Sequence, residues 1–177
     1  MPTPDFIVSL REKIGHEQLF LPGVTAVIIR PVPEGAPLWE VPTVLLAQRA
    51  DNENWAPISG ICEPGEEAST TALREIKEEV GLDAQFEALL GVGQVGPVTY
   101  PNGDQCLFMD TAIRVSVAAD AEPVISDEEN LDAQWFSVAH LPSSVNATHR
   151  MLIADAVAQM RHPQGFRPRV GYSKRSR

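Results

Sequence analysis

The chain has 177 residues, 44% of them hydrophobic, and a formal net charge of −10 at pH 7. This length and apolar content suit one domain with a single buried core. Proteins bind a nucleic-acid backbone through surface lysine and arginine, so the acidic balance argues against a nucleic-acid partner.

The N-terminal sequence MPTPDFIVSL has no positively charged leader followed by an apolar stretch. No uncharged apolar run approaches the roughly 20 residues that span a bilayer. We therefore expect a soluble, cytoplasmic protein with no membrane partner. Cys62 and Cys106 lack CxxC or Cys/His ligand spacing, which favours reduced thiols. The histidines share no metal-ligand spacing either, and we assign no chemistry to His16, His140, His149 and His162.

The N-terminal third predicts a helix followed by two strands. Apolar residues recur at every fourth position from Asp5 to Gly15, which indicates a short helix. The β-branched run at 24–30 and the segment at 43–49 are typical of strands. Four prolines and a glycine make the intervening residues 31–42 a loop.

The middle of the chain predicts a long helix and a strand pair. No proline or glycine occurs from Glu66 to Val80, and Ala, Leu, Arg, Glu and Lys dominate, so we expect about four helical turns ending at Gly81. The dipeptide Asn102-Gly103 separates two apolar segments, 88–96 and 105–117, as the turn of a hairpin does.

A short strand at 133–138 and a closing helix at 145–160 complete the pattern. Interleaved strands and helices predict an α/β fold, a mixed sheet covered by helices on both faces. We divide the chain into an N-terminal helix and lead-in (1–23), a central domain (24–160) and a C-terminal tail (161–177). The tail holds six of the 14 basic side chains and no acidic residue, so we expect it to be solvated and flexible.

Glutamates crowd one face of the long predicted helix. Glu75, Glu78 and Glu79 are three and four positions apart and therefore share a face. Like charges at these offsets cost about a few tenths of a kcal/mol per pair. Taken alone, the pattern is typical of a solvated acidic face. A bound cation would offset the repulsion, because carboxylate oxygens are the ligands that Mg²⁺ and Mn²⁺ prefer.

The spacing of these residues favours the cation. Gly60 is followed after five residues by Glu66, and after seven more by REIKEEVGL, residues 74–82. This pattern resembles the signature of the Nudix hydrolases at every specified position. The flanking segments LLAQRADNENWAPISGICEPGE and DEENLDAQWFSVAHLP are also similar to this family, so the resemblance covers about residues 24–160. Ser59 stands where many members have a second glycine, which affects the expected shape of the loop.

The resemblance implies a Nudix-type α/β/α sandwich in which the motif forms a loop, a helix and a loop. In this family the glutamates of the motif hold divalent cations against a diphosphate. By position, the implied metal ligands are Glu75, Glu78 and Glu79, with the backbone carbonyl of Gly60 as a further ligand. The implied cofactor is Mg²⁺, with Mn²⁺ as an alternative.

Further site residues are implied around this metal set. Glu66 and Arg74 would orient the ligands, Arg74 by pairing with a carboxylate. Members often add an acidic residue from a later loop, and Glu129 is the first candidate here, with Glu128 second. A carboxylate near the metal takes the proton of the attacking water. Glu79 and Glu129 are alternatives for this role.

Residues outside the motif are candidates for substrate binding. Arg49 either contacts a phosphate or forms a surface ion pair. Trp55 either borders a nucleobase or packs against the loop, and packing is favoured. The turn with Tyr100, Asn102 and Asp104 either overhangs the pocket and selects the substrate or is only a tight turn.

The implied activity is metal-dependent hydrolysis of a diphosphate bond in a nucleoside diphosphate linked to another moiety. ADP-ribose or a nucleotide sugar is favoured, with release of a nucleoside monophosphate. An ordinary or oxidised nucleoside triphosphate is the close alternative. A nucleotide-sensing module without activity would tend to lose motif glutamates, and all are present. The diphosphate isomerase branch is not excluded by composition or spacing. Family members are frequently homodimers, but this sequence does not indicate its own oligomeric state.

Overall fold

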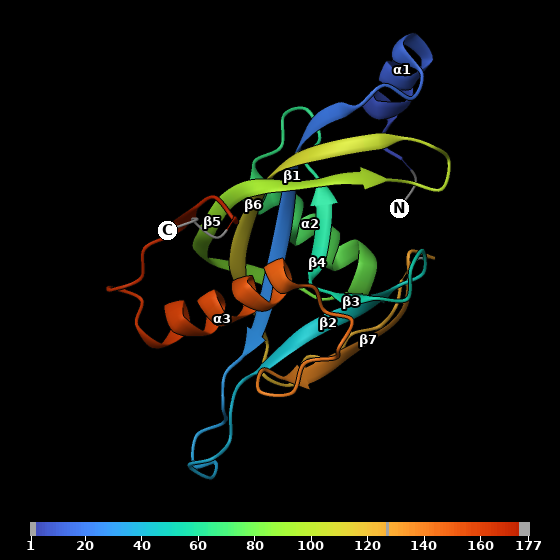
Figure 1. Cartoon of the computed structure of the whole chain (residues 1–177). Helices are drawn as coiled ribbons and strands as arrows, with labels where there is room; N and C mark the ends of the chain where they lie inside the picture. The colour runs from blue at the N-terminus through green and yellow to red at the C-terminus, as the bar shows by residue number, and fades with distance from the viewer. Residues whose placement is uncertain (1–2, 127, 174–177) are drawn as a thin grey trace.

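The computed structural model describes residues 3–126 and 128–173. These residues form three helices and eight strands, and the strands make one mixed sheet (Figure 1). In chain order the elements are α1 (Asp5–Ile14), β1 (Leu19–Arg30), β2 (Thr43–Arg49), β3 (Trp55–Ala56), β4 (Ile58–Ile61), α2 (Ala68–Val80), β5 (Ala84–Thr99), β6 (Gln105–Val117), β7 (Asn130–Ser137), α3 (Ala147–Arg161) and β8 (Arg169–Val170). No helix among them is long and apolar enough to cross a membrane.

Strand β1 is the centre of the sheet. One of its edges pairs in parallel with β6, from Leu19 to Ile28. Its other edge pairs with β4 over Gly23–Ala26 and then with β2 at Ile29 and Arg30, both antiparallel. Because one edge serves two strands in turn, the sheet divides at this point, and β2 continues into an arm with β3 and β7.

The two faces of β1 supply two separate hydrophobic cores. Successive side chains of a strand point to opposite faces, so Val24, Ala26 and Ile28 pack toward α2. The alternate residues Val27 and Ile29 pack with α3 instead. Helices α2 and α3 therefore cover opposite faces of the sheet (Figure 1), which confirms the predicted α/β architecture.

Several element boundaries differ from the prediction. Strand β1 begins at Leu19 rather than residue 24, because pairing with β6 carries the strand through Pro22 and Gly23. Helix α2 begins at Ala68 rather than Glu66. Glu66 instead lies in the preceding turn, where its carboxylate accepts a hydrogen bond from the Glu63 backbone N–H.

Two further strand predictions were too short or shifted. The segment 88–96 lies inside the longer β5, which pairs with β6 almost along its whole length. The late strand β7 begins at Asn130, three residues before the predicted start, through pairing with β2. The strands at 43–49 and 105–117 have the predicted bounds.

The C-terminal segment differs from the expected flexible tail. Strand β8 pairs in parallel with β5, joining Gly91 to Arg169 and Val92 to Val170. The Arg169 guanidinium forms an ion pair with Asp155 of α3. Gly91 and Gly93 of β5 permit this approach. A Cβ at Gly91 would collide with Arg169, and a Cβ at Gly93 would collide with the ring of Tyr172. The described part of the tail, up to residue 173, is thus joined to the sheet, and residues 174–177 lie outside the described range.

Replacing Gly93 should release this segment. A Cβ at Gly93 would lie 2.5 Å from the ring of Tyr172, so Gly93→Ala must displace the ring. We expect trypsin to cleave after Arg169 faster in the variant than in the wild type, as followed by mass spectrometry of the intact chain. Gly165→Ala is the control, because a Cβ there meets only a carbonyl at 3.9 Å. Equal cleavage rates in all three proteins would contradict this account.

Candidate active site

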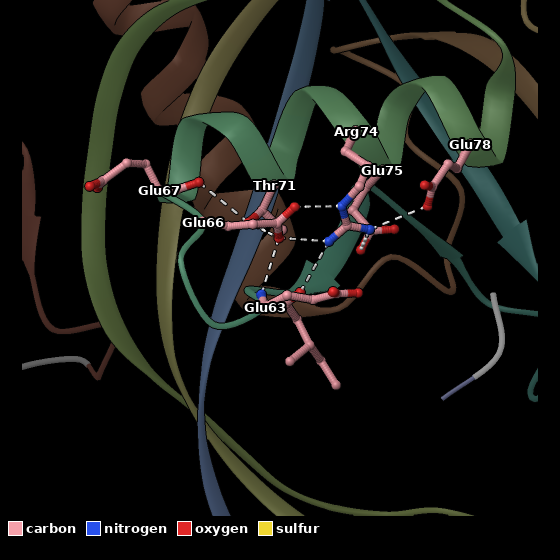
Figure 2. A network of polar contacts seen from close by, with 8 residues as sticks. Glu63, Glu66, Glu67, Thr71, Arg74, Glu75 and Glu78 are labelled. Atoms are coloured by element: carbon pink, nitrogen blue, oxygen red, sulfur yellow. Dashed lines mark hydrogen bonds and ion pairs between the residues drawn. The ribbon is translucent and has the colours of Figure 1, made fainter. Parts of the chain in front are cut away.

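Glu66 is the hub of the turn that precedes α2. Its Oε1 accepts from Arg74 Nε at 2.8 Å and its Oε2 from Arg74 Nη2 at 2.9 Å, a two-pronged pair (Figure 2). The hydroxyl of Thr71 also donates to Oε2, at 2.9 Å. With the Glu63 N–H at 3.1 Å, these donors fix the turn to the first half of the helix. Hydrogen bonding from the Arg74 guanidinium has the largest effect among these contacts, and it lowers the pKa of Glu66 to about 2.

The same guanidinium also contacts two of the predicted metal ligands. Arg74 Nη1 donates to Glu75 Oε1 at 3.0 Å and to Glu78 Oε2 at 3.2 Å. Figure 2 shows the three carboxylates arranged around this one cation. Hydrogen bonding to Glu66, followed by the nearby negative charges, raises the pKa of Arg74. Arg74 therefore stays charged and reduces the repulsion between carboxylates that share a helix face.

Glu75 lies in the narrow space between α2 and β4. It is buried, and this burial raises the pKa of its carboxyl to about 7 despite the neighbouring Arg74. A side chain at Gly60 of β4 would overlap the Glu75 carboxylate. The glycine of the motif therefore provides the space in which Glu75 lies directly against the strand backbone.

Glu79 is also buried, at the other end of the acidic face. Its Oε2 accepts from Asn130 Nδ2 at 2.7 Å, and its backbone carbonyl accepts from the Ser126 N–H at 3.1 Å. The loop before β7 is thereby fastened to the last turn of α2. Glu129 lies in this loop next to Asn130, and its carbonyl accepts from the Ala50 N–H at 2.7 Å. Glu79 and Glu129, the two alternatives for the general base, therefore both lie near the contact between this loop and the end of α2. Glu128 is exposed.

The oxygen atoms of the predicted metal ligands suit a divalent cation, since carboxylate and carbonyl oxygens are hard ligands. In residues 3–126 and 128–173, no three His, Cys, Asp or Glu side chains are already placed as a metal cluster. Glu75 and Glu78 are instead turned toward Arg74. Mg²⁺ retains several waters and needs only one or two protein carboxylates. The residues therefore suit such an ion, although their side chains are not gathered around one point.

A cavity of about 740 Å³ adjoins two of these predicted ligands, Gly60 and Glu75. Alternate residues of β1, Leu21, Gly23 and Thr25, contribute to its floor together with Phe108 and Asp110 of β6. Its walls come from α1, the β2–β3 loop, the β5–β6 turn and the first turns of α3. A cavity of this size, lined by both apolar and polar side chains, is suited to a small organic ligand.

Five predicted site residues line this cavity: Arg49, Gly60, Glu75, Asp104 and Glu129. Tyr100 and Asn102 of the β5–β6 turn line it as well. Five other predicted site residues are not among the described residues that line the cavity: Glu66, Arg74, Glu78, Glu79 and Trp55.

The predicted substrate-binding residues already have protein partners. Arg49 forms a two-pronged pair with Asp51, with both N···O distances 3.0 Å. Asp104 pairs with His16 at 2.8 Å and with Arg11 at 3.3 Å. Trp55 packs edge-on against Phe136, with ring centroids 4.8 Å apart. Trp55 thus has the packing role that the sequence favoured, whereas Arg49 and Asp104 present paired charges at the cavity rim.

Asp110 and His149 are two of the polar cavity residues that the sequence did not indicate. Asp110 is buried in β6 and accepts hydrogen bonds from Thr25 and Tyr172. His149 of α3 lines the cavity, its Nδ1 is buried without a hydrogen-bond partner, and burial lowers its pKa to about 4. An acidic residue within the largely apolar stretch CLFMDTAI was the available signal for Asp110. For His149, no spacing in the sequence distinguished it from the other histidines.

The fold and the site together define an α/β domain in which an acidic helix face lies beside a cavity of about 740 Å³. The chain matches the family model of the NUDIX domain over residues 21–156. It therefore belongs to the NUDIX domain family, whose hydrolases generally use divalent metals. This confirms the family that the motif indicated.

The chain is similar in sequence to two named relatives. It is 32% identical over 134 residues to the human 8-oxo-dGDP phosphatase NUDT18, a match that covers 70% of this chain and 37% of the relative. It is 32% identical over 88 residues to the NAD-capped RNA hydrolase NudC of Pseudomonas putida, covering 50% of this chain and 29% of the relative. The chain thus spans about a third of the length of each of these curated relatives.

A solved structure supports the fold. The crystal structure of a C. elegans Ap4A hydrolase binary complex superposes with a TM-score of 0.61. The match covers 80% of this chain and 98% of that chain at 16% sequence identity. At this identity the likeness concerns the arrangement of the elements only.

Neutralising Glu66 should destabilise the protein in a pH-dependent way. The pKa of Glu66 is lowered in the folded state, from 4.5 to about 2. Its contribution to the free energy of unfolding is therefore full above about pH 4.5 and is lost as the pH falls toward 2. We expect Glu66→Gln to cost about 1–3 kcal/mol at pH 7, allowing for partial exposure. Urea unfolding from pH 7 down to pH 3 should show the difference narrowing.

The matched control is Glu40→Gln, which changes an exposed glutamate of the proline-rich loop. Its stability should stay close to the wild type at every pH. A Glu66→Gln deficit that is absent, or that widens in acid, would contradict the Arg74 pairing as its cause.

Gly60→Ala should weaken divalent-cation binding. The new methyl group would force the Glu75 carboxylate away from β4. Displacing a ligand or its support typically costs about 10–100-fold in metal affinity. We expect a loss of this size in Mn²⁺ affinity, measured by titration calorimetry, with Gly165→Ala as the control that binds normally. Unchanged Mn²⁺ affinity in Gly60→Ala would remove Glu75 and Gly60 from the metal site.

Proposed function

We propose that this protein hydrolyses the diphosphate bond of a nucleoside diphosphate that carries a further group, and releases a nucleoside monophosphate. The observation that supports this most directly is the complete set of motif carboxylates, Glu75, Glu78 and Glu79, beside a cavity large enough for a nucleoside. Two relatives that share about a third of their sequence with the chain over the matched regions are named for diphosphate-containing substrates, 8-oxo-dGDP and NAD-capped RNA.

In this proposal, Glu75, Glu78, Glu79 and the Gly60 carbonyl hold Mg²⁺, or Mn²⁺ in its place. When bound, the cation screens the charge of the phosphoryl oxygens and lowers the pKa of a bound water. The protein must then supply ligands with fixed positions. Arg74 provides this by pairing with Glu66 on one side and with Glu75 and Glu78 on the other.

The proton of the attacking water requires a carboxylate acceptor. Glu79 is held by Asn130 at 2.7 Å, and Glu129 lines the cavity from the neighbouring loop. Glu79 is positioned among the predicted metal ligands and Glu129 on the substrate side. Both stay candidates for this role, since either group lies at the junction between α2 and the cavity.

The remainder of the substrate lies in the cavity. A sugar, as in ADP-ribose or a nucleotide sugar, and a further phosphate, as in a nucleoside triphosphate, both leave the same nucleoside monophosphate after attack between the first two phosphates. The name of the human relative favours a nucleotide with an oxidised base as the second candidate. The paired cations Arg49 and Arg11 at the cavity rim offer N–H groups to either kind of leaving group.

Glu79→Gln should abolish turnover without unfolding the protein. The amide keeps the shape of the side chain, and its oxygen can still accept from Asn130 Nδ2. It removes the charge needed for metal binding or proton transfer, so we expect kcat to fall by at least about 100-fold. The assay is chromatographic product analysis with Mg²⁺ or Mn²⁺ against ADP-ribose, nucleotide sugars, dinucleotides and ordinary or oxidised nucleoside di- and triphosphates. Glu40→Gln is the matched control with normal turnover.

Full activity of Glu79→Gln against whichever nucleotide is cleaved would overturn the assignment of the acidic helix as the catalytic centre. Binding of a nucleotide without cleavage by the wild-type protein would instead support a sensing module. Proton transfer without release of a monophosphate would indicate the isomerase branch of the family.

A further inference from the structure

Asp110 lies in the floor of the cavity, in one row of residues across four strands. The register joins Ile61 of β4 to Gly23 of β1, Gly23 to Asp110 of β6, and Asp110 to Gly93 of β5. Residues paired in this way point to the same face of a sheet. The cross-strand neighbours of Asp110 on both sides are therefore glycines.

The space beside Asp110 differs on its two sides. Over Gly93 lies the ring of Tyr172 from the C-terminal segment, so this side is filled. On the other side, Gly23 lines the cavity, and a Cβ there would lie 3.3 Å from the Phe108 ring and 3.7 Å from the Gly60 carbonyl oxygen. The floor over Gly23 thus runs from the candidate metal-binding carbonyl to Asp110. The two ends are about two strand spacings apart, roughly 10 Å.

Two hydroxyl groups fix the orientation of the Asp110 carboxylate. Thr25 Oγ1 donates to Oδ1 at 2.9 Å, and the Tyr172 hydroxyl donates to Oδ2 at 2.7 Å. Each carboxylate oxygen can accept a second hydrogen bond. The group is only 4% exposed, and burial raises its pKa while the two hydroxyl donors lower it. A buried carboxylate with one hydrogen bond to each oxygen has remaining acceptor capacity that only a ligand or water in the cavity can use.

We propose that Asp110, positioned by Thr25 and Tyr172, is the residue that recognises the nucleobase, and that it selects bases of the guanine type. Guanine presents two adjacent N–H donors, N1–H and the N2 amino group, which match the two oxygens of a carboxylate. Adenine presents an acceptor, N1, beside its amino group, and this acceptor would face a carboxylate oxygen. The carboxylate also repels phosphates, so the diphosphate lies at the opposite end of the floor, near Gly60 and Glu75.

This inference rests on the proposed function for the position of the diphosphate, and it specifies the base in the substrate. It gives Tyr172 a positioning role, because the ring over Gly93 and the hydroxyl on Oδ2 hold the carboxylate in place. The C-terminal segment is thus part of the base subsite, although Tyr172 itself is separated from the ligand by Asp110.

The test compares guanine and adenine nucleotides on the full-length chain. The wild type, Asp110→Asn and Tyr172→Phe are assayed with GDP-mannose against ADP-ribose and with dGTP against dATP, and KM and kcat are measured for each. Asparagine keeps one acceptor for Thr25 or Tyr172 but places an N–H₂ group opposite the guanine donors. A hydrogen bond to a charged group contributes about 1.5–3 kcal/mol, so KM for guanine nucleotides should rise by about 10–100-fold. KM for adenine nucleotides should stay equal or fall, and Tyr172→Phe should show a smaller shift in the same direction.

Asp120→Asn, which changes an exposed aspartate in a turn, is the matched control and should keep the wild-type ratio of the two KM values. Thermal unfolding verifies that each variant is folded, and Tyr172→Phe carries the test if Asp110→Asn does not fold. An equal KM increase for both bases, or a wild-type preference for adenine nucleotides, would overturn the proposal.

A binding measurement separates this inference from the proposed function. Titration calorimetry of GDP and ADP onto Glu79→Gln, with Mg²⁺, needs no turnover. In one outcome, the wild type cleaves no nucleotide, Glu79→Gln binds GDP more tightly than ADP, and adding Asp110→Asn removes this difference. The base subsite is then supported, and the hydrolase function is wrong. If nucleotides are cleaved and no difference between GDP and ADP depends on Asp110, the hydrolase function stands and the base subsite is wrong.

Discussion

The guanidinium of Arg74 is the interaction on which the candidate site depends. Three glutamates on one face of a helix repel each other, and two of these are buried, where the repulsion is less screened. Arg74 contacts Glu75 and Glu78 of the helix and joins them to Glu66 of the preceding turn. Removing a partner of such a group leaves an uncompensated charge, which costs more than the ion pair gains. The spacing between Glu66 and Arg74 in the motif therefore has a mechanical reason: it brings the turn back over the second turn of the helix.

Close approach of side chains to the strand backbone is the second requirement, and glycines permit it. Gly60 admits the Glu75 carboxylate against β4, and Gly93 admits the Tyr172 ring against β5. Gly23, between them in the sheet, lines the cavity floor beside the Phe108 ring. The division of β1 between β4 and β2 separates the two arms of the sheet and puts the acidic end of α2 next to the cavity. Packing of α2 and α3 on opposite faces then fixes both sides of this junction.

The sequence predicted the parts of the fold that depend on local pattern. The helix at 66–80, the strands at 43–49 and 105–117, and the family itself followed from periodicity and from motif spacing. What could not be predicted depends on contacts between distant segments. The early start of β1 requires β6, and the docking of the C-terminal segment requires two glycines of β5 some 75 residues earlier. The role of Asp110 likewise depends on the cross-strand register and on Thr25 and Tyr172, none of which is visible from its neighbours in the chain.

The charges around the cavity explain why its proposed ligand requires cations. Arg49 and Arg11 are already paired with Asp51 and Asp104, while Glu75, Asp110 and Glu129 also line the wall. Without a bound cation, a diphosphate in this cavity would meet more negative than positive charge at short range, and Coulomb repulsion would exclude it. A divalent cation at the Glu75 end reverses the sign of the potential there and leaves the Asp110 end negative. The cavity then has opposite polarity at its two ends, which suits a molecule with phosphates at one end and N–H donors at the other. Metal binding would thus determine the direction in which a nucleotide enters as well as the chemistry at its diphosphate.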